Sequence, residues 1–414
     1  MTCAARRFEH ALLIDGTGRA PLPDATVTVD GDGRITYAGP AELAPESPGA
    51  AVFDLQGMTL LPGFIDAHVH FLFGPKTNSP AADQALTAFQ VAERMRRTLH
   101  AGVTAARDLG GLSAGYARAQ EVGLIEAPRL LTAGRIIGHT GGHCDATGPD
   151  GHSATSHFTI LADDELSARV AVRTILREGA DVVKICATGG MGSPHDDPDD
   201  EDLSEAEIRA VVDEARRHRG KKVAAHAQGT AGILNALRGG VASVEHGYGM
   251  TEEACDLALA NGAFLVPTLA TAFNPLDPAK MTAAHFEKKS RWADNTRQNI
   301  ALAISRGVSI AMGTDAGVSP HALNLMELSY LVQLGMTELQ AITTGTLSGA
   351  RLLGIDNAVG TVEAGKLADL VVTDVNPLDD IAALARPEHI RMVLQAGSIR
   401  KDTLSAATRS LIPS

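Results

Sequence analysis

Residues 64–70 read Phe-Ile-Asp-Ala-His-Val-His, an apolar run typical of a β-strand that also carries two histidines. Alternate residues of a strand share one face, so the apolar residues at positions 65, 67 and 69 lie on one side. His68 and His70 then share the other side. Two imidazoles placed in this way can bind one metal ion, although an isolated pair is about as often two hydrogen-bonded core histidines. The run therefore predicts a strand that ends in candidate metal ligands.

Outward from this run, short apolar segments alternate with longer helical segments between about residues 60 and 355. The predicted strands are 60–70, 104–109, 129–135, 181–187, 222–227, 243–246, 263–269 and 309–315. Predicted helices include 80–101, 164–178, 204–219 and 252–261, the third with a capping box in which Ser204 is followed by Glu207. Eight strand–helix alternations in roughly 300 residues predict an α/β fold of the (β/α)₈ TIM-barrel type. A doubly wound sheet is the structural alternative.

The two flanks of this region have a different pattern of short strands and tight turns. Residues 11–60 contain the turn sequences Gly-Thr-Gly at 16–18 and Gly-Asp-Gly at 31–33, and β-type patterns return after residue 354. We expect residues 1–61 and 357–414 to pair in a small β-sandwich beside a catalytic barrel of residues 62–356.

Bulk composition restricts the class of protein. The chain has 414 residues, 44% hydrophobic content and a formal charge of −13, with no basic cluster that would favour nucleic acid or a membrane surface. Its four cysteines show neither zinc-knuckle nor redox-motif spacing. No apolar run has the length of a signal peptide core or a membrane helix. We therefore expect a cytoplasmic protein that has neither nucleic acid nor a membrane as its partner.

Lys184 lies in the apolar run 182–186 with the parity that directs its side chain into the barrel. Burial of an unpaired ammonium is costly, and a lysine that becomes neutral can react with carbon dioxide to give a carbamate. That product would be a carboxylate able to bridge two metal ions. The simpler alternative is an ion pair with an inward acid such as Asp66 or Asp315.

Three further polar residues end apolar strand-like runs. His226 and His246 each stand at the end of such a run, and Asp315 ends the last one. Side chains at the carboxyl ends of barrel strands converge on the catalytic face. Together with His68, His70 and Lys184, they predict one reactive site rather than six separate structural residues.

This order of residues resembles the amidohydrolase superfamily, binuclear type with a bridging carbamylated lysine. The segments 61–70 (LPGFIDAHVH) and 360–370 (GTVEAGKLADL) are typical of it. The segments 140–145 (TGGHCD), 187–194 (ATGGMGSP) and 313–317 (GTDAG) resemble the branch of Xaa-Pro dipeptidases, arginine/lysine carboxypeptidases and ochratoxin-hydrolysing amidases. That branch usually has glycine where Cys144 stands.

The resemblance implies two divalent metal ions, with zinc the expected metal and manganese or iron the alternatives. It implies the ligands His68, His70, Lys184, His226, His246 and Asp315. Lys184 would be an N6-carboxylysine that bridges both ions. Asp315 would also be catalytic, taking a proton from a metal-bridging hydroxide and delivering it to the leaving amine. Relatives in this branch also suggest a homo-oligomer.

Substrate contacts are harder to predict. The loop 138–157 contains His139, His143, His152 and His157, and we name His139 and His143 as candidates to hold a substrate carboxylate. The equally weighted alternative is that these histidines lie in a solvated loop and do not bind substrate. Tyr248 directly follows the strand that ends at His246 and could donate a hydrogen bond, or be plain pocket wall. The acidic run 195–202 is expected to be solvated surface.

The preferred function is hydrolysis of an amide bond in dipeptides or N-acyl amino acids that carry a free carboxylate. Hydrolysis of a cyclic amide, carbamate or xenobiotic amide on the same site is the alternative. Deamination is disfavoured because mononuclear deaminase relatives lack a lysine at the position of Lys184. A non-catalytic scaffold is disfavoured because all six ligand positions are filled.

Overall fold

A computed structural model of the protein describes residues 4–74, 84–145, 158–192, 195–273, 282–405 and 408–410. Its parallel strands form two sheets, in the orders β6-β7-β8 and β10-β9-β11-β12-β13-β14. The bounds are β6 (Phe64–Val69), β7 (Val103–Asp108), β8 (Arg129–Thr132), β9 (Ile136–Gly138), β10 (Thr159–Leu161), β11 (Val183–Cys186), β12 (Val223–Ala227), β13 (Ser243–His246) and β14 (Phe264–Val266). The backbone N–H of Asp181 donates to Thr132 O, which brings the start of β11 to the end of β8.

The predicted eighth strand, 309–315, is not a regular strand. Ile310 forms a parallel bridge with Leu265 of β14, and Ala316 forms one with Val69 of β6. The segment therefore occupies the place of the eighth strand in a (β/α)₈ barrel. Regular pairing breaks because the carbonyl of His68 accepts from the N–H groups of two successive residues, and the second of these, Asp315, has a positive φ of 54°.

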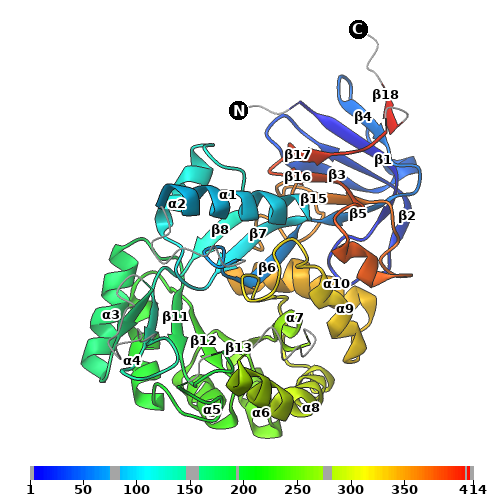
Figure 1. Ribbon diagram of the computed structural model, residues 1–414. Coiled ribbons are helices and arrows are strands. Elements are labelled where there is room, and N and C mark those ends of the chain that lie inside the picture. Colours follow the sequence, from blue (N-terminus) through cyan, green and yellow to red (C-terminus); the bar gives the residue numbers. More distant parts are fainter. Residues whose placement is uncertain are drawn as a thin grey trace.

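Helices cover the outside of the parallel strands (Figure 1). Their bounds are α1 (Gln84–His100), α2 (Ala114–Glu121), α3 (Glu165–Arg177), α4 (Glu205–Arg217), α5 (Thr230–Gly239), α6 (Glu252–Asn261), α7 (Leu269–Ala272), α8 (Ala283–Ser305), α9 (Met326–Gln333), α10 (Glu338–Thr343) and α11 (Gly349–Leu353). The predicted capping box is confirmed at the start of α4, where Ser204 and Glu207 cap each other. Outward-facing strand residues such as Val183 and Ile185 pack with these helices in the largest apolar cluster.

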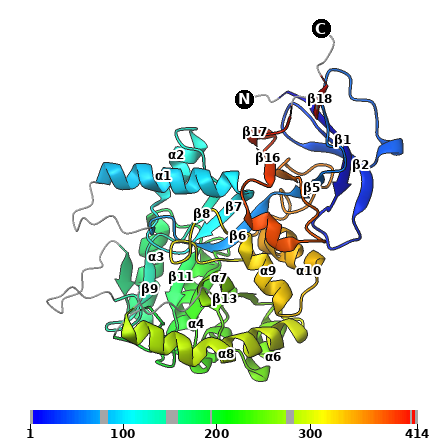
Figure 2. The same cartoon turned by 45° about the vertical axis from the view of Figure 1, so that its right-hand side comes forward.

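The two ends of the chain form a separate sheet in the order β17-β16-β15-β5-β1-β2-β3, with β4 between β1 and β18. Its strands are β1 (Arg6–Leu13), β2 (Leu22–Val29), β3 (Ile35–Pro40), β4 (Ala51–Asp54), β5 (Thr59–Pro62), β15 (Leu370–Thr373), β16 (Ile390–Gln395), β17 (Ser398–Asp402) and β18 (Arg409–Ser410). Antiparallel pairing of β15 with β5 joins the C-terminal to the N-terminal segment. Figure 2 shows this sheet beside the barrel, next to α9 and α10. The boundaries at residues 62 and 356 stay a prediction.

The sheet has its own apolar core, to which both ends of the chain contribute. Phe8 and Leu60 from the N-terminal strands pack there with Leu370 and Met392 from the C-terminal strands. In the described residues, no helix is both long and apolar enough to cross a membrane.

Candidate active site

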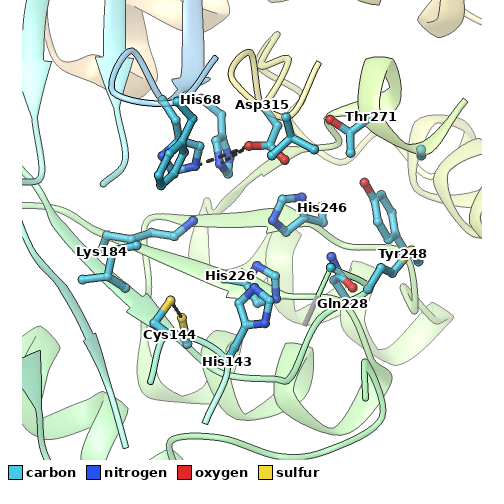
Figure 3. A pocket seen from close by; sticks show the side chains of 18 of the residues that line it. His68, His143, Cys144, Lys184, His226, Gln228, His246, Tyr248, Thr271 and Asp315 are labelled. Carbon is cyan, nitrogen blue, oxygen red and sulfur yellow. Dashed lines mark hydrogen bonds and ion pairs between the residues drawn. The ribbon is translucent and has the colours of Figure 1, made fainter. Parts of the chain in front are cut away.

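A pocket opens at the carboxyl ends of the barrel strands, and Figure 3 shows the side chains that point into it. Its lining includes all six residues predicted as metal ligands: His68, His70, Lys184, His226, His246 and Asp315. They come from β6, β11, β12, β13 and the segment after Ile310. The strand parity inferred from the sequence thus directs these side chains into one space.

His68, His70 and Asp315 form the tightest group. The Nε2 atoms of His68 and His70 lie 3.6 and 3.3 Å from Oδ1 of Asp315. One donor atom from each of the three residues can be chosen so that all lie within 4.8 Å of one another. Two imidazoles and a carboxylate at this spacing are a suitable donor set for a divalent metal such as zinc.

The other ring nitrogen of each histidine is held by the surrounding protein. His68 Nδ1 lies 2.9 Å from Glu245 Oε2, and Glu245 in turn accepts from the buried guanidinium of Arg107 at 2.9 Å. His70 Nδ1 lies 3.4 Å from the carbonyl of Gly110. Such contacts orient a metal-binding imidazole and fix its tautomer. Glu245 was not predicted as a site residue, although it stands inside β13.

His226 and His246 face each other with ring centroids 4.6 Å apart. Nε2 of His226 lies 3.1 Å from the carbonyl of Gly189, which leaves its Nδ1 for another partner. Nδ1 of His246 lies 2.8 Å from Thr268 Oγ1, which leaves its Nε2. Each ring therefore keeps one nitrogen that could bind a metal ion.

Lys184 is only 3% exposed, and no carboxylate forms an ion pair with it among the described residues. Burial lowers the pKa of its ammonium. Lys184 forms no ion pair with Asp66 or Asp315 in the described chain, and Asp66 instead accepts hydrogen bonds from Thr314 and Asn324. The charge of Lys184 still acts on Asp315, where it opposes the rise in pKa that burial causes. The side chain points toward the histidines in Figure 3.

Burial also sets the protonation of the other candidate ligands. It lowers the pKa of His70 to about 3 and holds the pKa values of His68, His226 and His246 well below 6.5. These imidazoles are therefore neutral at pH 7, as metal binding requires. Burial raises the pKa of Asp315 to about 7, within the range useful for proton transfer.

Two of the three candidate substrate contacts line the pocket. The ring of His143 stacks on His226 at 4.2 Å between centroids, and its Nδ1 lies 2.7 Å from Asp196 Oδ2. Burial lowers the pKa of His143, but the hydrogen bond to Asp196 and nearby acids raise it overall. Tyr248 is fully buried in the pocket wall, with its hydroxyl 3.1 Å from Thr268 Oγ1.

His139 does not line the pocket. Its Nε2 lies 2.9 Å from Asp202 Oδ1, and its side chain is 30% exposed. The prediction that it holds a substrate therefore has no support from the pocket's geometry. His152 and His157 of the same predicted loop lie outside the described residues.

The acidic run 195–202 is not merely solvated surface, as the sequence analysis expected. Asp196 is buried and contacts His143, and Asp202 accepts from the backbone N–H of His143. The expectation was wrong for these two residues because a charge run gives no sign of which carboxylates fold inward to hold another loop.

Part of the pocket wall comes from residues that were not predicted to lie near the site. Lys289 of α8 is 6% exposed and lines the pocket, as does His285 one helical turn before it. Cys144 and Cys186 also line the pocket. The first turns of α8 carry no apolar strand pattern, so nothing in their local sequence indicated proximity to the site.

Residues 59–400 match the model of the Amidohydrolase family, and the chain belongs to that family of enzymes, which act on carbon–nitrogen bonds. Ochratoxinase from Aspergillus niger is 30% identical, with 94% of this chain and 85% of the relative covered. A Xaa-Pro dipeptidase with methionine bound in its active site superposes with a TM-score of 0.88 at 29% identity, covering 96% of this chain and 99% of the other. A prolidase complexed with N-methylphosphonate-L-proline gives 0.88 at 30% identity, covering 96% and 100%. These relatives confirm the predicted branch.

Proposed function

We propose that this enzyme is a binuclear metal-dependent amidase that hydrolyses dipeptides or N-acyl amino acids with a free carboxylate. One observation carries the proposal: four neutral imidazoles, one carboxylate and a buried lysine without an ion-pair partner in the described chain converge on a single pocket. A scaffold that had lost its activity would have no reason to keep this costly arrangement of buried polar groups.

The donor chemistry fits two divalent ions. His68, His70 and Asp315 would hold one ion, and His226 with His246 would hold the other. Lys184 would bridge the two ions as N6-carboxylysine. Among the described lining residues, it is the one lysine that lies on a barrel strand, and that strand directs its amine into the pocket. When bound, the two ions would activate water and polarise the scissile carbonyl.

Asp315 is the group that would move the proton. Its carboxylate accepts a proton from the attacking water and then donates it to the leaving nitrogen. The two steps need opposite protonation states, and one carboxyl group that lines the pocket beside His68 and His70 can serve in both.

The free carboxylate of the substrate would meet the cationic part of the pocket. Lys289 and His143 bring positive charge to the lining, and Tyr248 brings a hydroxyl donor. The ligands named for two similar structures, methionine and a proline phosphonate, are an amino acid and an amino-acid derivative. They support an amino-acid leaving group here. The homo-oligomer, the cytoplasmic location and zinc as the metal stay predictions.

The test is amine release from a library of dipeptides and N-acyl amino acids, using zinc-loaded enzyme with added bicarbonate. The matched control is the same library with the C-terminal carboxylate converted to a carboxamide. Selective cleavage of the free acids would establish the proposal and define the side-chain preference. No cleavage of either set, with two metal ions per chain found by elemental analysis, would reject it in favour of cyclic amides or carbamates.

A further inference from the structure

Two thiols face each other in the wall of the active-site pocket. Cys144 belongs to the loop that follows β9, and Cys186 is the last residue of β11. Their Sγ atoms lie 2.9 Å apart, the contact drawn as a dashed line in Figure 3. Both side chains are buried, and both line the pocket. The proposed amidase mechanism uses neither thiol.

The fold holds the two sulfurs in this position. The carbonyl of Cys144 accepts a hydrogen bond from Thr159 Oγ1 at 2.6 Å, which ties its loop to β10. Cys186 is paired in the parallel sheet with His226 of β12. A disulfide bond is about 2.05 Å long, so the sulfurs need to approach by less than about 1 Å. We expect small adjustments of the two side chains to be sufficient for this approach.

We propose that Cys144 and Cys186 are a redox site of the folded enzyme, where a peroxide converts the two thiols to a reversible disulfide. One thiol attacks a peroxide oxygen, giving a sulfenic acid and releasing one water from hydrogen peroxide. The second thiol then attacks that sulfur and displaces the second water. Two thiols are oxidised to one disulfide, and one peroxide is reduced to two waters. The pocket gives the oxidant a route to the buried sulfurs.

The disulfide would fasten two parts of the proposed site to each other. Cys144 directly follows His143, whose ring stacks on His226. Cys186 lies two residues after Lys184 on the same strand, so the two side chains share a face. The bond would close a loop between residues 42 apart in the chain and so restrict the unfolded state. Oxidation should therefore stabilise the fold around the pocket.

The experiment treats the native, full-length protein with hydrogen peroxide, removes the oxidant and alkylates the remaining thiols after denaturation. We expect two of the four cysteines to escape alkylation and a linked pair of tryptic peptides, residues 136–169 and 185–209. Reduction with dithiothreitol should restore four alkylated thiols. The Tm of the oxidised protein should rise by a few degrees.

Variants identify the pair. In Cys144→Ser and in Cys186→Ser, the partner thiol should not form the link, and peroxide should give no rise in Tm. Cys255→Ser is the matched control, because its buried thiol lies on α6 and the linked peptides should persist. A wild-type protein that keeps both thiols free, or oxidises them only beyond the disulfide level, would overturn the proposal. None of these measurements depends on turnover, so they stand apart from the test of the amidase function.

Discussion

At the scale of single residues, we expect Lys184 to decide how many metal ions the site can hold. Its amine is buried and has no carboxylate partner in the described chain. Burial favours the neutral amine, and only the neutral amine can react with carbon dioxide. The reaction turns a residue that would repel metal ions into one that binds them.

Replacement of Lys184 by methionine tests this role. Lys184→Met keeps the length and apolar stem of the side chain but cannot form a carbamate. We expect bound metal to fall from two ions to about one per chain and kcat/KM to fall by more than about 100-fold. Elemental analysis gives the metal content, and ¹³C-bicarbonate should give a carbamate NMR signal in the wild type alone. Two tightly bound ions in the variant would contradict the bridging role.

We propose that Asp315 combines metal ligation with proton transfer, and the conservative variant Asp315→Asn separates the two roles. The amide oxygen can still face a metal ion, but the side chain can no longer accept a proton. Loss of a general acid–base group costs about 10²- to 10⁴-fold in rate, so kcat should fall by that factor while much of the metal remains. Steady-state kinetics beside elemental analysis measures both. Wild-type kcat in this variant would remove Asp315 from the mechanism.

Lys289 of α8 contributes positive charge to the pocket wall. A hydrogen bond to a charged group is worth about 1.5–3 kcal/mol, so Lys289→Met should raise KM for substrates with a free carboxylate by about 10-fold or more. The kcat value should change little because the residue does not contact the reacting bond. The carboxamide analogues provide the control, since their KM should be unaffected. An equal rise for both would mean that Lys289 shapes the pocket without binding the carboxylate.

At the scale of elements, the outer helices are tied to one another by ion pairs as well as by apolar packing. Glu214 of α4 has a side chain only 3% exposed and accepts a hydrogen bond from Arg173 of α3 at 2.7 Å. That bond is the main cause that lowers the pKa of Glu214 to about 2. The ionised form of Glu214 is therefore more favoured in the folded chain than in the unfolded chain, where the pKa has its ordinary value of 4.5.

The lowered pKa fixes the sign of the pH dependence. The contribution of Glu214 to stability is fully present above about pH 4.5 and is lost as the pH falls through about 2. Because Arg173 is largely exposed, we expect Glu214→Gln to lower the free energy of unfolding by only about 1 kcal/mol at pH 7. The difference from wild type should shrink toward pH 3 in urea titrations. Glu205→Gln, which breaks an exposed pair with Arg209 within α4, should have a smaller effect. If the difference in the free energy of unfolding between the variant and the wild type grew at low pH, the ionised carboxylate of Glu214 would not be the stabilising form.

At the scale of the whole molecule, the terminal sheet is fastened to the barrel by buried polar contacts. The Nε2 group of Gln395, at the end of β16, donates to the carbonyls of Thr104 and Ala127 at 3.0 Å each. An ion pair between Arg129 and Asp369 at 3.1 Å joins the same two parts. The sheet thus supports the barrel from the side, away from the pocket residues of β11 to β13 (Figures 1 and 2).

Gln395→Leu should loosen this junction without changing the site. The substitution leaves two carbonyls without their side-chain donor in a buried place, at a cost of about 2 kcal/mol. We expect Tm to fall by several degrees while kcat and KM at 25 °C stay near the wild-type values. Thermal unfolding and steady-state kinetics measure the two effects. A large loss of activity at 25 °C would show that the sheet also controls the geometry of the pocket.

The sequence by itself predicted the barrel class from the alternation of strands with helices. It predicted the six candidate ligands from strand parity, from their places at the ends of strands and from the family resemblance. His68, His70 and Lys184 could be assigned to the inner face from their immediate neighbours alone, and the structure brings all of them into one pocket. The match to the Amidohydrolase family supports the same barrel class.

Only the tertiary structure decided how loops from different strands meet. Several features of the site depend on residues that are far apart in the chain. They are the Cys144–Cys186 contact, the stacking of His143 on His226, the contact of His139 with Asp202 and the place of Lys289 of α8 in the pocket lining. The irregular eighth segment was also unforeseen, since its hydrogen bonds depend on His68 some 250 residues earlier. Strand parity is a property of neighbouring residues, whereas these contacts depend on the packing of the complete barrel.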